Sequence, residues 1–210
     1  MKTTLLTVLL TCTASAVFAQ GQVQFRNLYS SGSINVNAPV TLWPDGSMLL
    51  DNSNPLWRAA LLGGPTTAAP VNLAAGVLGT LTQLYHPVNT TLSWCNFRAA
   101  PNQGSVTVAS ASRVLNDVNW GQQGLVQMVV WQGNYDTWAA AFAARQAGTP
   151  DVWIGASNPL TLTMPTGPTD PNLTYLVGLQ AFSIVPVPEP TTFALAGLGA
   201  AALLIFRRRN

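Results

Sequence analysis

The sequence predicts an all-β fold, an antiparallel β-sandwich with one short helix, for residues 20–185. Two observations predict this fold. Short segments of alternating or continuous apolar residues, rich in valine, leucine and aromatic side chains, have the length of single strands. Clusters of glycine, proline, asparagine and aspartate separate these segments, as tight reversals between antiparallel strands require. Many short strands with such punctuation are typical of a sandwich.

The expected strands follow one another along the chain. They are residues 22–25, 56–62, 105–110, 125–132, 160–164 and 175–185. The turns expected between them lie around Asp45 and Gly46 and at residues 62–67, 100–105 and 165–172.

Residues 136–148 predict the one short helix. Asp136 is the expected N-cap, and Gly148 is the expected stop at the C-terminal end. Trp138 and Phe142 stand at helical spacing and therefore share a face. We expect this face to be buried against the edge of a sheet.

The start of the chain predicts a signal helix over residues 1–19. Lys2 precedes an apolar run, and small residues precede the expected cut between Ala19 and Gln20. This pattern is typical of a peptide that directs export and is then removed. The expected organisation is therefore a signal peptide at 1–19, one exported domain at 20–185 and a distinct C-terminal segment at 186–210.

The two cysteines give a second interpretation of the N-terminus. In this alternative Cys12 is acylated and the protein is a lipoprotein, but Thr11 fits poorly just before such a cysteine. If Cys12 leaves with the signal, Cys95 is the only cysteine of the exported protein and has no internal disulfide partner. The domain is then expected to be held by its core alone, with Cys95 as a buried structural residue.

The charge distribution excludes a nucleic-acid binder. The net charge of +2 comes from the two ends of the chain, where Lys2 and three consecutive arginines lie. Residues 20–185 hold five arginines against six aspartates, which leaves a net charge of −1. These arginines are scattered singly along the sequence, so it predicts no basic patch for phosphate contacts. We expect no nucleic-acid partner.

The end of the chain predicts a short transmembrane helix. Phe193 to Phe206 is a run without polar side chains. At about 1.5 Å per residue it reaches ~21 Å, against a hydrocarbon core of ~30 Å. Local thinning of the bilayer accommodates such a span. Arg207, Arg208 and Arg209 can hold its end among the cytoplasmic headgroups.

A short motif precedes this apolar run. Val187, Pro188, Glu189 and Pro190, followed by the apolar helix and the arginine cluster, resemble the PEP-CTERM sorting signal of Gram-negative bacteria that make extracellular polysaccharide. The resemblance implies exosortase as a partner, a transient stop in the inner membrane, and release or attachment at the cell surface. The alternative is a plain C-terminal anchor in which the prolines only keep the linker extended.

The residues capable of catalysis form no recognisable constellation, so we expect a protein that is not an enzyme and needs no cofactor. His86 is the only histidine, and no serine stands in a nucleophile elbow. One histidine and one free cysteine cannot supply the ligands of a zinc site. Residues 51–54 gather oxygen donors, but an Asx-turn explains them better than a calcium site. No catalytic residue and no metal ligand is predicted.

The seven tryptophans allow two interpretations. In the first they supply the burial that a sandwich without disulfides needs. In the second, Trp120 and Trp131 lie exposed beside amide side chains and contact a glycan. Because no cations cluster there, such binding is expected to be weak and nearly independent of salt.

These observations predict an exported surface or extracellular-matrix protein with a structural or adhesive role among polysaccharides. The first alternative is a carbohydrate-binding module of the same fold, for which exposed tryptophans in a row would be the sign. The second is a divergent hydrolase, for which a pocket gathering His86 with an aspartate would be the sign.

Overall fold

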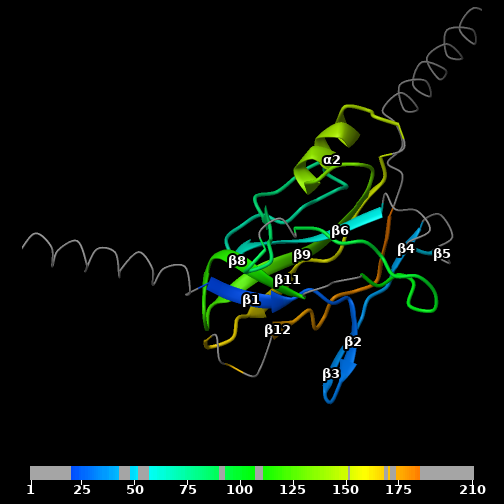
Figure 1. Ribbon diagram of the computed structural model, residues 1–210. Helices are drawn as coiled ribbons and strands as arrows, with labels where there is room; N and C mark the ends of the chain where they lie inside the picture. The colour runs from blue at the N-terminus through cyan, green and yellow to red at the C-terminus, as the bar shows by residue number, and fades with distance from the viewer. Residues whose placement is uncertain are drawn as a thin grey trace, which may run out of the picture.

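The computed structural model describes residues 20–42, 48–51, 57–89, 93–106, 111–150, 152–167, 170 and 174–184. The fold is mostly β, with 45% strand and 6% helix, and it confirms the predicted sandwich class. Strands form two layers that enclose one core, and a helix covers the outer face of one layer (Figure 1). Among the described residues no helix is long and apolar enough to cross a membrane.

The first layer is built on the longest strand pair. β6 (Trp57–Pro65) and β9 (Gln123–Gln132) run antiparallel, from Trp57 opposite Gln132 to Pro65 opposite Gly124. β7 (Thr82–Gln83) extends the sheet beyond β6, and β10 (Ile154–Ala156) and β11 (Leu160–Thr163) both pair with β9. β6 and β9 are nearly continuous apolar segments because both faces of this sheet are covered.

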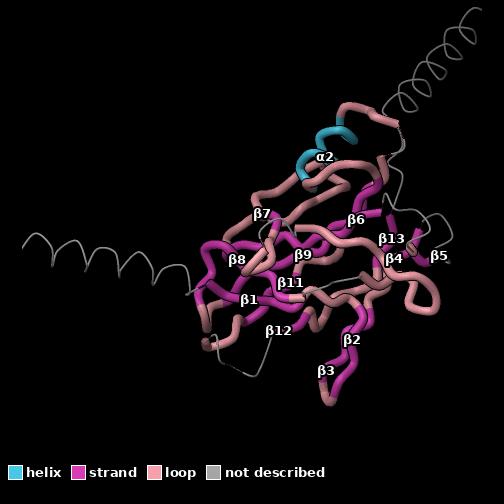
Figure 2. The backbone as a smooth tube through the Cα atoms, in the orientation of Figure 1, coloured by secondary structure: helices cyan, strands magenta, loops and turns pink. Residues whose placement is uncertain are grey.

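The second layer joins the two ends of the described chain. β1 (Gln20–Gln24) lies between β8 (Ser112–Asn119), antiparallel to it, and β12 (Thr174–Tyr175), parallel to it. β4 (Val40–Leu42) lies between β5 (Met48–Leu49) and β13 (Phe182–Ile184), again with the last strand parallel. β2 (Leu28–Ser31) and β3 (Ile34–Asn37) form a hairpin that extends away from the other strands (Figure 2).

Alternation of side chains along β6 and β9 divides the buried residues into two clusters. Val126, Met128 and Val130 point into the main core, between the two layers. Val129 and Trp131 point to the other face, into a helix-side core. The residues of the helix-side core are Ala60, Leu62, Val71, Leu81, Val129, Trp131, Trp138, Ala141, Phe142, Val152 and Ile154.

The predicted helix is α2 (Trp138–Gln146), and one cap differs from the prediction. The N-cap is Thr137, whose hydroxyl accepts a hydrogen bond from the Ala140 amide at 3.3 Å. Asp136, the residue expected there, instead accepts from Arg58 at 3.0 Å. The predicted stop is correct, since Gly148 has a φ of +77° just after the helix.

The face of α2 that was expected to be buried is buried, but against a different part of the sheet. Trp138, Ala141 and Phe142 pack on Val129 and the other helix-side core residues, over the face of β6, β9 and β10. An edge position would have left that face of the central strands open to solvent. Figure 1 shows α2 on the opposite side of β6 and β9 from β1 and β12.

Four of the predicted strands are present. Residues 22–25, 56–62, 125–132 and 160–164 correspond to β1, β6, β9 and β11. The stretch expected at 175–185 is split, because a turn with Gly178 at a φ of +93° separates β12 from β13. The described part of 105–110 contains only an isolated bridge from Val106 to Phe97.

Candidate functional site

The described tryptophans do not form an exposed row. Trp57, Trp131 and Trp138 are buried, and the exposed fraction of Trp131 is 0%. Trp94, Trp120 and Trp153 are half-buried, and Trp43 lies outside the described residues. The sign expected for a tryptophan-based glycan platform is therefore missing from this part of the chain.

The interpretation of Trp131 as a glycan contact is wrong. Its ring packs edge to face against Trp138, with centroids 6.2 Å apart, and its indole N–H donates to the Tyr135 carbonyl at 3.0 Å. Residue alternation in β9 turns it into the helix-side core, which a helix covers. No face of this ring is left for a sugar.

Trp120 lies in the tight turn that joins β8 to β9. The turn is closed by the Asn119 amide, which donates to the Gln122 side-chain oxygen at 3.1 Å, and by the Gln122 amide, which donates to the Asn119 carbonyl at 3.1 Å. Gly121 adopts a φ of +74°, which favours glycine. The side-chain oxygen of Gln122, one of the amide side chains near Trp120, thus closes the turn. The role of Trp120 itself stays a prediction.

The candidate catalytic groups have local structural partners. His86 Nδ1 accepts from the amides of Val88 and Asn89, at 3.2 and 3.0 Å, and so closes a turn. The described aspartates have similar roles: Asp51 accepts from Gln103, Asp117 occupies a bulge of β8, Asp136 pairs with Arg58, and Asp170 accepts from Thr166.

No group of three metal-binding side chains occurs within the described ranges. Most of the weak calcium candidate, residues 52–54, lies outside them.

Cys95 is the buried structural residue that the sequence predicted. It is a free thiol whose backbone pairs with Ala59, and its Sγ lies 3.6 Å from the Ala59 carbonyl oxygen. Burial raises the pKa of the Cys95 thiol to about 12, although the nearby Arg113 guanidinium favours the thiolate. The main core excludes water from this sulfur, and the thiolate is therefore strongly disfavoured in the folded state.

The raised pKa predicts a loss of stability in alkaline solution. The unfolded thiol ionises near pH 9.0, whereas the folded thiol stays neutral. The free energy of unfolding is therefore expected to fall by about 1.4 kcal/mol per pH unit once pH exceeds 9. Urea unfolding at several pH values, compared between the native protein and Cys95→Ala, measures this. An unchanging difference between the two proteins from pH 8 to 11 would contradict it.

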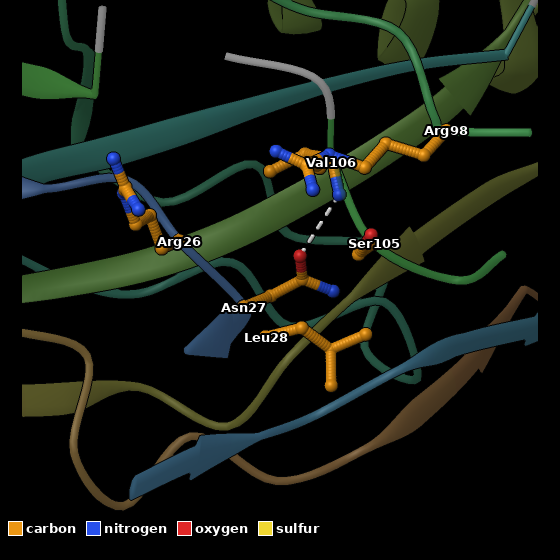
Figure 3. Close-up of a pocket in the computed structure, with 6 residues that line it drawn as sticks. All are labelled: Arg26, Asn27, Leu28, Arg98, Ser105 and Val106. Carbon is orange, nitrogen blue, oxygen red and sulfur yellow. Dashed lines mark hydrogen bonds between the residues drawn. The ribbon is translucent and has the colours of Figure 1, made fainter. Parts of the chain in front are cut away.

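A pocket of about 70 Å³ opens where β1 leads into β2. Arg26, Asn27, Leu28, Arg98, Ser105 and Val106 line it. Figure 3 shows Arg98 reaching across Val106 toward the side on which Arg26 lies, with the Asn27 amide facing Val106. Both arginine side chains are exposed, and none of the described residues that line the pocket is acidic.

The buried side chain of Asn27 holds the floor of this pocket together. Its Nδ2 donates to the carbonyls of Ala38 and Gly104, at 2.8 and 2.7 Å, and its Oδ1 accepts from the Val106 amide at 3.0 Å. Two acceptors and one donor around one amide fix which atom is nitrogen. Because both N–H groups are used, Asn27 has no donor left for a ligand, whereas the two arginines can offer donors.

Two stacked tyrosines lie beside Arg26, one of the residues that line the pocket. The Arg26 guanidinium lies 5.2 Å from the centroid of the Tyr29 ring. Tyr29 stacks on Tyr175 of β12, with centroids 4.6 Å apart and planes inclined by 10°. The Tyr175 hydroxyl donates to that of Tyr29 at 3.3 Å, which lowers the pKa of Tyr29 and raises that of Tyr175. Both rings are half-buried, so their edges reach solvent.

Sequence reasoning missed Arg26 and Arg98 because it treated the arginines as isolated. They lie far apart along the chain, and no periodic pattern links them. The β1 strand and the Phe97 to Val106 bridge bring them to one pocket. The one available signal was the polar Asn27 shortly after the alternating segment 22–25, since a polar residue that is buried requires several partners.

The C-terminal segment was the other predicted site. Val187, Pro188, Glu189 and Pro190, the helix from Phe193 to Phe206, the arginines Arg207, Arg208 and Arg209, and Ala19 of the cleavage site all lie outside the described residues. Gln20 is described and is the first residue of β1. The cleavage position and the domain boundaries stay predictions.

Comparison with known proteins identifies this segment. No curated protein and no solved structure matches the chain. Residues 186–209, however, match the family described as the PEP-CTERM protein-sorting motif. The match spans the proline-glutamate motif, the apolar run and the arginine cluster, the three parts on which the resemblance was based. The chain therefore carries a PEP-CTERM protein-sorting motif, which implies an exported protein that exosortase sorts.

Proposed function

We propose that this protein is a structural or adhesive component of the cell surface or extracellular matrix, that it acts among polysaccharides, and that it is not an enzyme. The sorting motif at residues 186–209 carries the proposal, since it implies export through the inner membrane and processing by exosortase. The inner membrane is then a transient partner, and extracellular polysaccharide a lasting one.

The fold supports a non-enzymatic role. Of the side chains most suited to catalysis, His86, Asp51 and Asp170 accept hydrogen bonds that close turns or join neighbouring segments. Asp136 pairs with Arg58. Ionisation of Cys95 is suppressed by the main core. A sandwich whose reactive groups serve its own turns is suited to presenting a stable surface.

The sorting part of the proposal predicts the two ends of the mature protein. In a strain that contains exosortase, the extracellular protein is expected to begin at Gln20 and to end near Pro188 to Pro190. Mass spectrometry of surface-released material measures both ends. Surface material that retains Arg207 to Arg209 would contradict the processing, as would precursor that accumulates in the cytoplasm.

One variant tests whether exosortase recognises the motif, separately from whether the apolar run anchors the protein in the membrane. Glu189→Gln changes the motif by one charge and leaves the apolar run and the arginines intact. It is expected to leave the precursor in the inner membrane with an intact C-terminus. Normal processing of this variant would contradict a role of the Glu189 charge in recognition by exosortase. Co-sedimentation of the mature protein with the host's polysaccharide tests the matrix role separately.

A further inference from the structure

We propose that Arg26 and Arg98 bind the carboxylate of an acidic sugar residue at the pocket beside the Tyr29 and Tyr175 stack. The choice of a sugar, in preference to another carboxylate, rests on the proposed location among polysaccharides. This site replaces the tryptophan-based site, and it reverses the expectation that binding is independent of salt.

The backbone around the pocket holds both arginines in a fixed frame. The Arg98 amide donates to the Ser105 carbonyl at 2.9 Å, next to the bridge between Phe97 and Val106. Val106 in turn donates to Asn27, the residue that follows Arg26. The two guanidinium groups therefore extend from segments that are hydrogen-bonded to each other through buried groups. Little backbone ordering is left for a ligand to impose, which favours binding.

The charges around the pocket leave both cations available to an anion. Arg58 pairs with Asp136, at 3.0 Å, on another part of the fold. Arg26 contacts the face of Tyr29, which contributes no counter-charge within the pocket. A planar guanidinium donates two parallel hydrogen bonds to a carboxylate, and two guanidinium groups can enclose one carboxylate between them.

The size of the pocket and its neighbours favour a sugar acid. Since one water needs about 10–15 Å³ by the same measure, about 70 Å³ accommodates a carboxylate and the atoms beside it but not a whole oligosaccharide. The rest of a sugar ring would lie outside, where the edges and hydroxyls of Tyr29 and Tyr175 offer amphipathic contacts. A polymer of acidic sugars could place one residue here and continue along the surface.

The experiment compares a carboxylated polymer with its uncharged ester and with a sulfated polymer of another sugar. Mature protein purified from the extracellular fraction is titrated with polygalacturonate, with its fully methyl-esterified form and with dextran sulfate. Binding of polygalacturonate is expected, with an affinity that falls as salt rises. The esterified polymer is expected to bind at least 10-fold more weakly. Equal binding of both galacturonate polymers would overturn the proposal, and so would preferential binding of dextran sulfate.

Substitutions assign the binding to the pocket. Arg26→Gln and Arg98→Gln are each expected to weaken polygalacturonate binding by about 10-fold or more, because each removes a charge-assisted hydrogen bond. Arg145→Gln removes the same charge from α2 and is expected to leave the affinity unchanged. Equal weakening by all three variants would show a non-specific charge effect and would overturn the assignment.

Two further readouts keep the result interpretable. Both pocket arginines are exposed, so their variants are expected to unfold at the same temperature as the native protein. Arg26→Lys and Arg98→Lys keep the charge but lose the paired donors, and an intermediate affinity is expected. Failure of binding in every arm would refute the site while leaving the mass-spectrometric test of sorting unaffected.

Discussion

Trp131→Ala is expected to lower the free energy of unfolding by about 3–5 kcal/mol, as removal of a large core side chain usually does. The ring is 0% exposed, packs against Trp138 and donates to the Tyr135 carbonyl, so the substitution leaves a cavity and removes one buried hydrogen bond. The Tyr135 carbonyl keeps its second partner, the Arg58 guanidinium, at 2.6 Å. A domain of this size is typically stable by about 5–15 kcal/mol. The loss is therefore a large share of the total, and urea unfolding measures it.

Trp120→Ala is the matched control for this experiment. Trp120 is half-buried in the turn between β8 and β9, outside both clusters of buried residues. Its removal is expected to cost less than half of the Trp131 effect. A larger loss for Trp120→Ala than for Trp131→Ala would contradict the placement of these two rings.

Asn27→Ala is expected to cost about 2–5 kcal/mol. The substitution leaves the Val106 amide and the Ala38 carbonyl without the hydrogen-bond partner that Asn27 supplies. Each buried polar group that loses its partner costs about 1–3 kcal/mol. The Gly104 carbonyl loses less, because it also accepts from the Val40 amide at 3.0 Å. Thermal or urea unfolding measures the change.

Two controls test the reason for that cost. Asn27→Asp keeps the shape but replaces both N–H donors with an acceptor, so it is expected to be at least as destabilising as alanine at neutral pH. Asn35→Ala, on the exposed side of β3, is expected to change the free energy of unfolding by less than about 0.5 kcal/mol. If Asn27→Asp were as stable as the native protein, the assigned hydrogen bonds would be wrong.

The parts of the fold that the sequence predicted are those with strong local patterns. β6 and β9 are long apolar runs, and α2 has an apolar face and a glycine stop. β8 was missed because its pattern is broken by a bulge with β1, where Asp117 has a φ of +59°. Aspartate tolerates this conformation better than most residues, but in the sequence it resembles a turn.

The placement of site residues depended on information that local patterns lack. The sequence left an exposed Trp131 open as one interpretation, although Val129 shares its face of β9, because it did not reveal that α2 covers that face. Arg26 and Arg98 line the same pocket because the buried amide of Asn27 hydrogen-bonds their two segments together. The sorting motif, by contrast, could be found from the sequence because its three parts are contiguous.

The parallel pairs at the ends of the described chain bear on how the protein folds during export. β1 pairs with β12, and β4 pairs with β13. Two strands near the start of the described chain therefore pair with strands in residues 174–184, at its end. Pairings between such distant segments form late and slowly. While the chain crosses the inner membrane, one edge of β1 and one edge of β4 are therefore expected to stay open, and open strand edges favour aggregation. Completion of the sheets is expected only after residues 174–184 have crossed.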